Sequence, residues 1–379
     1  METIFTDESR CCGCAACVDV CPVEAVEMTA DKCGFTYPRI KQEICIGCGK
    51  CKRICPFADE ENIKNQSTLA YALRNKSREK VEKSSSGAFF PEIAAQVISE
   101  GGVVYASAFD SDFNAVHMRA ERMDELDKFR GSRYIQSKTD GIYKAVKKDL
   151  SQRKVMFVGT SCQVDALKHF LQKPYDNLIT VDVICRGVPS QKLFDDYKKS
   201  LEKVYGANLS SYSFRGKRIK GEIQDIYAEF SNGKKYSRAP IDDDFKSLYA
   251  RTLSLRPSCY QCKYTSTERV GDITLGDFWG IKKVLPDFAG DNGNSLILIS
   301  SKKGQELFEK VKTQFDFREV PIDKVSQPSL CCPAEETQAV KDFRSDYAEH
   351  GYDYIIKKYC QKTGIEKLKA KLKPILKGK

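Results

Sequence analysis

Beyond residue 68, hydrophobic residues alternate between short strand-like runs and segments with helical spacing. Mostly apolar runs predict strands at residues 69–73, 103–106, 155–158, 178–184, 273–275 and 296–299. Helical spacing of apolar residues follows the first and third of these runs, at Phe90–Ile98 and Val164–Leu171. Because strands and helices alternate, we expect an α/β domain with a largely parallel or mixed sheet.

Other segments depart from this alternation. The first 58 residues are dense in Cys and Gly, and the polar residues 59–68 read as a linker. The Asn232-Gly233 pair predicts a β-hairpin within residues 227–236. Residues 355–376 are rich in Lys and predict an amphipathic helix that Pro374 interrupts.

Composition narrows the function classes. The chain of 379 residues has 17 Cys but 3 His, which in a chain without an export signal indicates metal or redox chemistry rather than disulfides. We find no apolar run long enough for a transmembrane segment and no secretory signal, so we expect a cytoplasmic protein. The net charge of +10 favours a solvated basic helix face over a nucleic-acid site.

Two copies of one cysteine pattern occupy the first 58 residues. Each is Cys-x2-Cys-x2-Cys-x3-Cys-Pro, the run typical of bacterial two-cluster iron–sulfur proteins. In such a run the fourth cysteine binds the other cluster, so we expect two crossed [4Fe–4S] sites. They are Cys11, Cys14, Cys17 and Cys55 for one, and Cys45, Cys48, Cys51 and Cys21 for the other. The alternative, zinc or structural disulfides, fits this doubled spacing poorly. Cys12 and Cys33 fall outside it and read as small buried or loop thiols.

A second set of cysteines lies in the α/β region. Cys162 and Cys185 follow predicted strands, and Cys259 and Cys262 form a Cys-x2-Cys. The carboxyl ends of parallel strands meet at a ligand crevice, so these thiols are expected to form one four-thiolate site. Either a third [4Fe–4S] cluster or a zinc ion suits them, and their spacing alone does not separate the two.

Further segments suit a phosphate-bearing ligand. Ser84-Ser85-Ser86-Gly87 opens a predicted helix, whose free N–H groups and positive dipole end favour a pyrophosphate; a simple N-cap is the alternative. The donor-rich loop 130–137 offers Arg130 and Arg133 to phosphate and Tyr134 for stacking, unless it is merely solvated. Asp277, at the end of a predicted strand, is a candidate catalytic carboxylate or a turn former. A G-x-G-x-x-G motif after a strand is missing, so a Rossmann-type site is not indicated.

These motifs together resemble the coenzyme F420 hydrogenase/dehydrogenase beta-subunit family. They lie in its order over about two-thirds of the chain, from roughly residue 69 to 320. They are residues 85–87, 129–137, 159–163, 185–190, 255–262 and 272–280. The N-terminal ferredoxin module resembles a common fusion in that family.

The resemblance implies an FAD-containing iron–sulfur oxidoreductase. It would pass electrons between a hydride carrier, coenzyme F420 or a similar molecule, and ferredoxin-type clusters through FAD and the third cluster. The expected cofactor-binding residues are Ser85, Ser86, Gly87, Arg130, Gly131, Ser132, Tyr134, Gln136, Ser137 and Thr160, with Asp277 as the catalytic candidate. Many oxygen-sensitive thiolate ligands also suggest an anaerobic setting.

Two departures leave the substrate open. Ser161 stands where the family usually has Pro, and Arg186 where it usually has His. The alternative function is an electron-transfer adaptor without its own substrate, serving a partner reductase or a polysaccharide-modifying enzyme. We expect a redox partner protein or small hydride carrier, no nucleic acid, and leave peripheral or oligomeric association open.

The predicted organisation has four parts. A bacterial-type ferredoxin-like α+β module with two [4Fe–4S] clusters spans residues 1–58, and a linker spans 59–68. A flavin and iron–sulfur domain follows at 69–325, and a basic helical extension at 326–379 ends the chain.

Overall fold

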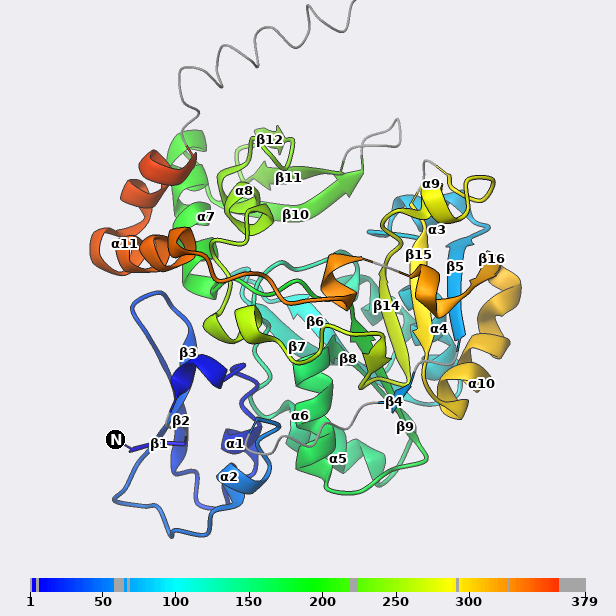
Figure 1. Ribbon diagram of the computed structural model, residues 1–379, viewed down its shortest axis with the longest axis horizontal. Coiled ribbons are helices and arrows are strands. Elements are labelled where there is room, and N and C mark those ends of the chain that lie inside the picture. The colour runs from blue at the N-terminus through cyan, green and yellow to red at the C-terminus, as the bar shows by residue number, and fades with distance from the viewer. Residues whose placement is uncertain are drawn as a thin grey trace, which may run out of the picture.

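The protein is described from a computed structural model (Figure 1). The structure describes residues 2–4, 7–57, 65–66, 69–217, 224–290, 293–325 and 327–360. The predicted basic helix at 355–376 therefore lies outside the described residues beyond Cys360. So does the predicted linker at 59–68, apart from β4 (Asn65–Gln66), a short strand that pairs with β13 (Glu268–Arg269).

A mixed sheet of eight strands forms the centre of the molecule, which confirms the predicted fold class. Its order is β16-β5-β15-β14-β9-β8-β6-β7. Three neighbouring pairs are parallel, namely β6-β8, β8-β9 and β9-β14. The other four pairs of this sheet are antiparallel. The strands are β5 (Leu69–Asn75), β6 (Val103–Phe109), β7 (Ala115–Ala120), β8 (Val155–Thr160), β9 (Leu178–Val183), β14 (Ile273–Asp277), β15 (Ser295–Ile299) and β16 (Phe315–Val320).

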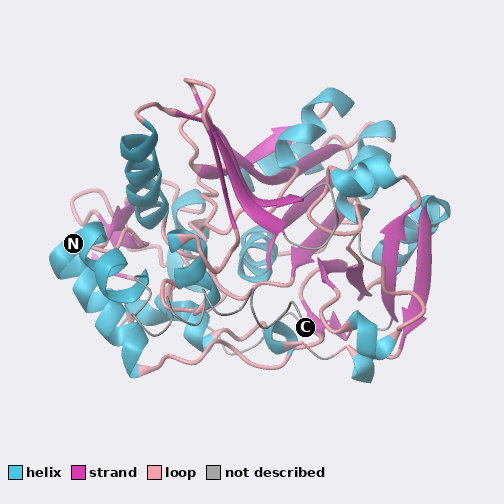
Figure 2. Cartoon of the chain, turned by 90° about the horizontal axis from the view of Figure 1, so that it is seen from above, coloured by secondary structure: helices cyan, strands magenta, loops and turns pink. Residues whose placement is uncertain are grey.

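Helices cover both faces of this sheet, as Figure 2 shows from above. On one face, α4 (Phe89–Ser99) and α10 (Lys302–Val311) bury apolar residues against the strands. On the other face lie α5 (Ile142–Leu150) and α6 (Ser161–Leu171). The predicted helices within 90–98 and 164–171 are α4 and α6. Shorter helices are α3 (Arg78–Glu82) and α9 (Ile281–Val284).

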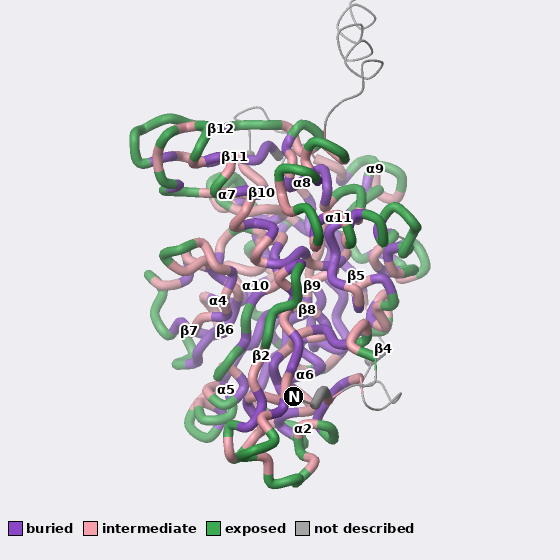
Figure 3. Tube along the Cα trace, turned by 90° about the vertical axis from the view of Figure 1, so that its left-hand side faces the viewer, coloured by how far each residue is buried: buried purple, intermediate pink, exposed green. Residues whose placement is uncertain are grey.

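The N-terminal module packs against the α5 and α6 side of the sheet (Figures 1 and 3). It consists of a three-stranded antiparallel sheet, in the order β1-β3-β2, and two short helices. These elements are β1 (Glu2–Thr3), α1 (Ala16–Asp19), β2 (Val26–Ala30), β3 (Thr36–Ile40) and α2 (Lys50–Arg53). Ala16 and Ile54 of the module join the apolar core beneath α5 and α6, so the two parts share a core.

A smaller antiparallel sheet lies at the opposite end of the molecule from the N-terminal module (Figures 1 and 3). Its order is β10-β11-β12, and Asn232 and Gly233 lie in the turn between β11 and β12, as predicted. Its strands are β10 (Leu209–Lys217), β11 (Gln224–Phe230) and β12 (Lys235–Arg238), and its helices are α7 (Gln191–Tyr205), α8 (Asp244–Ala250) and α11 (Gln338–Ile355). Within the described residues, every helix is too short or too polar to span a bilayer.

Candidate functional site

The parallel strands β8, β9 and β14 end at one cavity of about 1020 Å³. This volume is at the upper end of the range typical of small-molecule sites. Residues from both donor-rich segments and from the second cysteine set line it. The predicted residues that line it are Ser85, Ser86, Arg130, Gly131, Ser132, Tyr134, Gln136, Ser137, Thr160, Cys162, Cys185, Cys259, Cys262 and Asp277.

Gly87 does not line this cavity. A Cβ at Gly87 would lie 2.5 Å from the carbonyl oxygen of Leu73 and 2.9 Å from the backbone nitrogen of Ser295. Its own backbone N–H donates to Ser295 Oγ over 2.8 Å. Gly87 therefore lets the serine loop pack against the sheet, while Ser85 and Ser86 face the cavity.

The two donor-rich loops meet each other. The backbone N–H of Ser132 donates to Ser85 Oγ over 3.1 Å. Arg130 forms an ion pair with Asp127, but its Nη1 is buried without a hydrogen-bond partner among the described residues. Arg133, by contrast, donates to carbonyl oxygens of its own loop. A buried unpartnered guanidinium nitrogen, on a loop that contacts the serine loop, suits a phosphate group.

The four thiols of the second cysteine set lie on one wall of the cavity. Cys162 opens α6 directly after β8, Cys185 follows β9, and the Cys-x2-Cys lies on and after a short 3-10 helix at Pro257–Gln261. Burial raises the pKa of Cys259 well above its usual value, and the neighbouring Cys185 and Cys262 thiols raise it further. Buried thiols crowded in this way are stable as thiolates when a cationic metal group lies among them.

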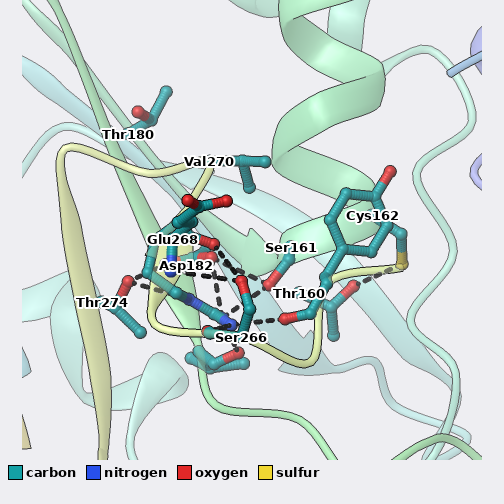
Figure 4. A network of polar contacts seen from close by, with 12 residues as sticks. Thr160, Ser161, Cys162, Thr180, Asp182, Ser266, Glu268, Val270 and Thr274 are labelled. Carbon is teal, nitrogen blue, oxygen red and sulfur yellow. Dashed lines mark hydrogen bonds and ion pairs between the residues drawn. The ribbon is translucent and has the colours of Figure 1, made fainter. Parts of the chain in front are cut away.

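A buried network fixes this wall (Figure 4). Arg269 donates from Nη2 to Asp182 Oδ2 over 2.9 Å and to Ser161 Oγ over 2.7 Å. Its Nη1 donates to the carbonyl oxygen of Tyr264, two residues after Cys262, over 2.6 Å. Thr274 of β14 donates to Asp182 as well. Arg269 thus connects β9, β14, the start of α6 and the loop after the Cys-x2-Cys.

Several thiols of the N-terminal module lie near one another, while their division into two crossed [4Fe–4S] groups stays a prediction. Burial raises the pKa of Cys17 well above its usual value, and the nearby Cys14, Cys11, Cys55 and Cys51 thiols add to the effect. Burial likewise raises the pKa of Cys51, and Cys21 and Cys48 add to it. Cys45 lies in the same loop as Cys48. Backbone N–H groups of Gly13 and Ala25 contact the sulfurs of Cys11 and Cys21 at 3.4 and 3.2 Å.

Cys12 lies between the thiols of the N-terminal module and the second cysteine set on the cavity wall. Hydrogen bonding to the Cys14 and Cys162 thiols raises its pKa well above the usual value, and burial adds to this. It lines both the cavity and a small apolar hollow formed by Cys11, Cys14, Cys17 and Cys55. Its interpretation as a plain buried thiol missed this position, since no regular spacing connects Cys12 with Cys162.

Gln136 and Arg256 attach the N-terminal module to the cavity wall. Gln136 Nε2 donates to the carbonyl oxygens of Cys12 and Gly13 at 2.9 and 3.1 Å. Arg256, which is fully buried, donates to Gln136 Oε1 and to the carbonyl oxygens of Cys11 and Thr36 at 2.9, 2.6 and 2.7 Å. Gln136 therefore has a structural role in addition to facing the cavity. Arg256 was not among the predicted site residues.

Thr160 and Ser137 are also engaged within the protein. Thr160 Oγ1 lies 3.1 Å from the sulfur of Cys162 and 3.1 Å from Gln163 Oε1. Ser137 Oγ lies 2.9 Å from His117 Nδ1. Burial lowers the pKa of His117 to about 4, so this imidazole is neutral at neutral pH.

Asp277 faces cations that the sequence did not single out. Its Oδ2 lies 2.7 Å from Arg215 Nη1, on β10. Lys246 of α8 and Tyr134 line the same part of the cavity. The small sheet and α8 thus contribute to the cavity lining, and only the folded chain brings Arg215 to Asp277 of β14.

Comparison with known proteins bears on two segments of the chain. Residues 10–58 match the family model of the 4Fe-4S dicluster domain, and residues 152–325 match that of the C terminus of the coenzyme F420 hydrogenase/dehydrogenase beta subunit. The predicted resemblance is confirmed. The dicluster match identifies an iron–sulfur module of the electron-transfer type at the N-terminus. The beta-subunit match covers Cys162, Cys185, Cys259, Cys262 and Asp277.

Similarity to individual proteins is weaker. A chain from the F420-reducing NiFe hydrogenase complex of Methanosarcina barkeri is 18% identical, and the comparison covers 79% of this chain and 94% of that chain with a TM-score of 0.45. The search of curated proteins found no match.

Proposed function

We propose that this protein is an FAD-containing iron–sulfur oxidoreductase that exchanges electrons between a small hydride carrier, coenzyme F420 or a similar molecule, and ferredoxin-type [4Fe–4S] clusters. The observation that carries this proposal is the single cavity that joins the two donor-rich loops to the second cysteine set. When bound there, FAD would supply the chemistry that links two-electron hydride transfer to one-electron transport.

The residues of the cavity fit a flavin dinucleotide. Arg130 Nη1 and the serine loop that precedes α4, whose N-cap is Ala88 rather than a serine, are suited to hold the pyrophosphate. The backbone N–H of Ser132 holds Ser85 against the donor-rich loop, while the Ser86 hydroxyl donates to the carbonyl oxygen of Asn294 and accepts from Ser295 Oγ. The cavity volume of about 1020 Å³ accommodates a ligand larger than most drug-sized molecules.

We assign a third [4Fe–4S] cluster rather than zinc to the second cysteine set, because a redox-active group would continue the electron path and zinc would interrupt it. Four thiolates around one zinc ion, at about 2.3 Å each, lie roughly 3.8 Å apart. Within the described ranges, no group of three or more His, Cys, Asp or Glu side chains has the geometry to hold a single metal ion. Cys185 nevertheless neighbours Cys162 and Cys262, and Cys259 neighbours all three, so the four thiols gather at one place on the cavity wall.

Contacts around Cys12 support an electron path into the N-terminal module. Cys12 neighbours Cys162 of the cavity wall and Cys14 of the first crossed group. The second crossed group lies farther out, where Cys48 is exposed and the basic helix α2 follows it in the chain. We propose that this group exchanges electrons with a redox partner protein, and that residues 1–58 and 69–325 act as one electron-transfer unit.

Anaerobic mixing with reduced coenzyme F420 tests the function. We expect the visible absorbance of the bound flavin to bleach, followed by that of the clusters, while NADH at the same concentration leaves both unchanged. Bleaching by a reduced partner protein but not by the deazaflavin would instead support the adaptor without its own substrate. That alternative gains interest from Ser161 and Arg186, at the two positions where this chain departs from the family pattern.

A further inference from the structure

A pair of cations lines the cavity on the side formed by the small sheet. Arg215 of β10 and Lys246 of α8 both face it. Arg215 Nη1 is paired with Asp277 Oδ2 at 2.7 Å, and the two side chains are 13% and 23% exposed. Because Asp277 already forms an ion pair with Arg215, the positive charge of Lys246 needs a different counter-ion.

Among the described residues, Lys246 has no carboxylate within ion-pair distance. The residue is 9% exposed, and its Nζ lies 2.9 Å from the centre of the Tyr134 ring and 4.7 Å from that of Tyr249. Across the part of the chain that the structure describes, Nζ has no hydrogen-bond acceptor and no ion-pair partner closer than 4 Å. The two ring faces attract the ammonium group at close range, whereas the carboxylates of Asp243 and Asp277 attract it from beyond ion-pair distance.

The nearby carboxylate of Asp243 does not serve as that partner. Its oxygens accept hydrogen bonds from the hydroxyls of Tyr197 and Tyr236, and from the backbone N–H of Lys246 itself at 2.7 Å. Asp243 caps α8 and is fully buried. Its hydrogen-bonding capacity is directed away from the cavity, toward the core of the small sheet.

A buried cation without a counter-ion is costly for the folded protein. Burial, and then the charge of Arg215, lowers the pKa of Lys246 to about 7, while Asp243 and Asp277 act in the opposite direction. An anionic group placed in the cavity beside Nζ would restore the charge balance. The same group could also contact the guanidinium of Arg215 and the rings of Tyr134 and Tyr249.

We propose that Lys246 and Arg215 form an anion-recognition site that binds a carboxylate or phosphate group of the small-molecule electron carrier. This site uses other cations than the proposed pyrophosphate site, because β10 and α8 supply Arg215 and Lys246, whereas Arg130 comes from loop 130–137, which also supplies Tyr134. That the anion belongs to the electron carrier rests on the proposed function; the binding of an anion does not.

Calorimetric titration of sulfate into the FAD-loaded protein tests the site. Sulfate stays a dianion across neutral pH, and FAD occupies the pyrophosphate site. We expect Lys246→Met to weaken sulfate binding about tenfold or more, as for the loss of a charged hydrogen bond, whereas Lys246→Arg stays close to the original protein. Lys302→Met, at a side chain that is 91% exposed, is the matched control and should change nothing.

The pH dependence of the unmodified protein gives a second readout. Because the charged form of Lys246 binds the anion and its pKa is about 7, sulfate affinity should fall as the pH rises above about 7, and Lys246→Met should lose this dependence. Equal sulfate affinity in Lys246→Met and the original protein, or an affinity that does not change with pH, would overturn the anion site. Loss of FAD from Lys246→Met would show that the cation holds the flavin phosphate, which would overturn a separate site while leaving the proposed function intact.

Discussion

Replacing Cys259 with serine is expected to remove about four of the iron atoms per chain and to stop electron flow between flavin and ferredoxin clusters. Cys259 is surrounded by the thiols of Cys185, Cys262 and Cys162, so its loss leaves that cluster with three thiolates. The eight predicted cluster ligands of the N-terminal module are untouched. Iron analysis and anaerobic reduction by a hydride donor measure both effects: the flavin should still bleach, while cluster reduction slows by about a hundredfold or more.

Cys332→Ser is the matched control for this variant. Cys332 is exposed, and its backbone carbonyl, rather than its thiol, accepts a hydrogen bond from Arg186. The control should keep its full iron content and its electron-transfer rate. A Cys259→Ser protein with unchanged iron, or with clusters that are reduced as fast as before, would contradict the assignment of this cysteine set.

Arg256→Met is expected to lower the free energy of unfolding by about 3–5 kcal/mol. The guanidinium is fully buried and donates to the carbonyl oxygens of Cys11 and Thr36 and to the side chain of Gln136. Methionine fills part of the space but leaves these acceptors without a donor. Since two of them belong to the N-terminal module, electron transfer from the cavity into the module should slow as well.

Denaturant unfolding of the anaerobically purified protein measures this effect. Arg318→Met is the control, because Arg318 is exposed and its guanidinium donates to the neighbouring carbonyl of Phe317. The control should change the free energy of unfolding by no more than about 0.5 kcal/mol. A loss of less than about 1 kcal/mol in Arg256→Met would show that the module is attached mainly by other contacts.

Much of the fold was predictable because apolar periodicity reports burial directly. The strands β8 and β9 and the helices α4 and α6 lie where the pattern of apolar residues predicts them. The orientation of the strands was less accessible. β15 runs antiparallel to both β14 and β5, and no residue within a short apolar run indicates which way its neighbour points.

Some residues of the candidate site were predictable from the sequence and others were not. Cysteine spacing is a local property, so the ligand groups could be proposed from the sequence alone. Arg256, Arg269 and Lys246 act through contacts with segments far away in the chain, and a single Arg or Lys has no signature in a sequence. Cys12 was predicted to be a plain buried or loop thiol for the same reason, since its neighbour Cys162 is 150 positions away.

The central claim is that clusters and a flavin share this chain, and anaerobic metal and flavin analysis of the purified protein tests it most directly. We expect about twelve iron atoms and one FAD per chain, as for three [4Fe–4S] clusters next to one flavin. About eight iron atoms with one zinc ion would contradict the third cluster. A colourless protein without iron or flavin would contradict the whole account.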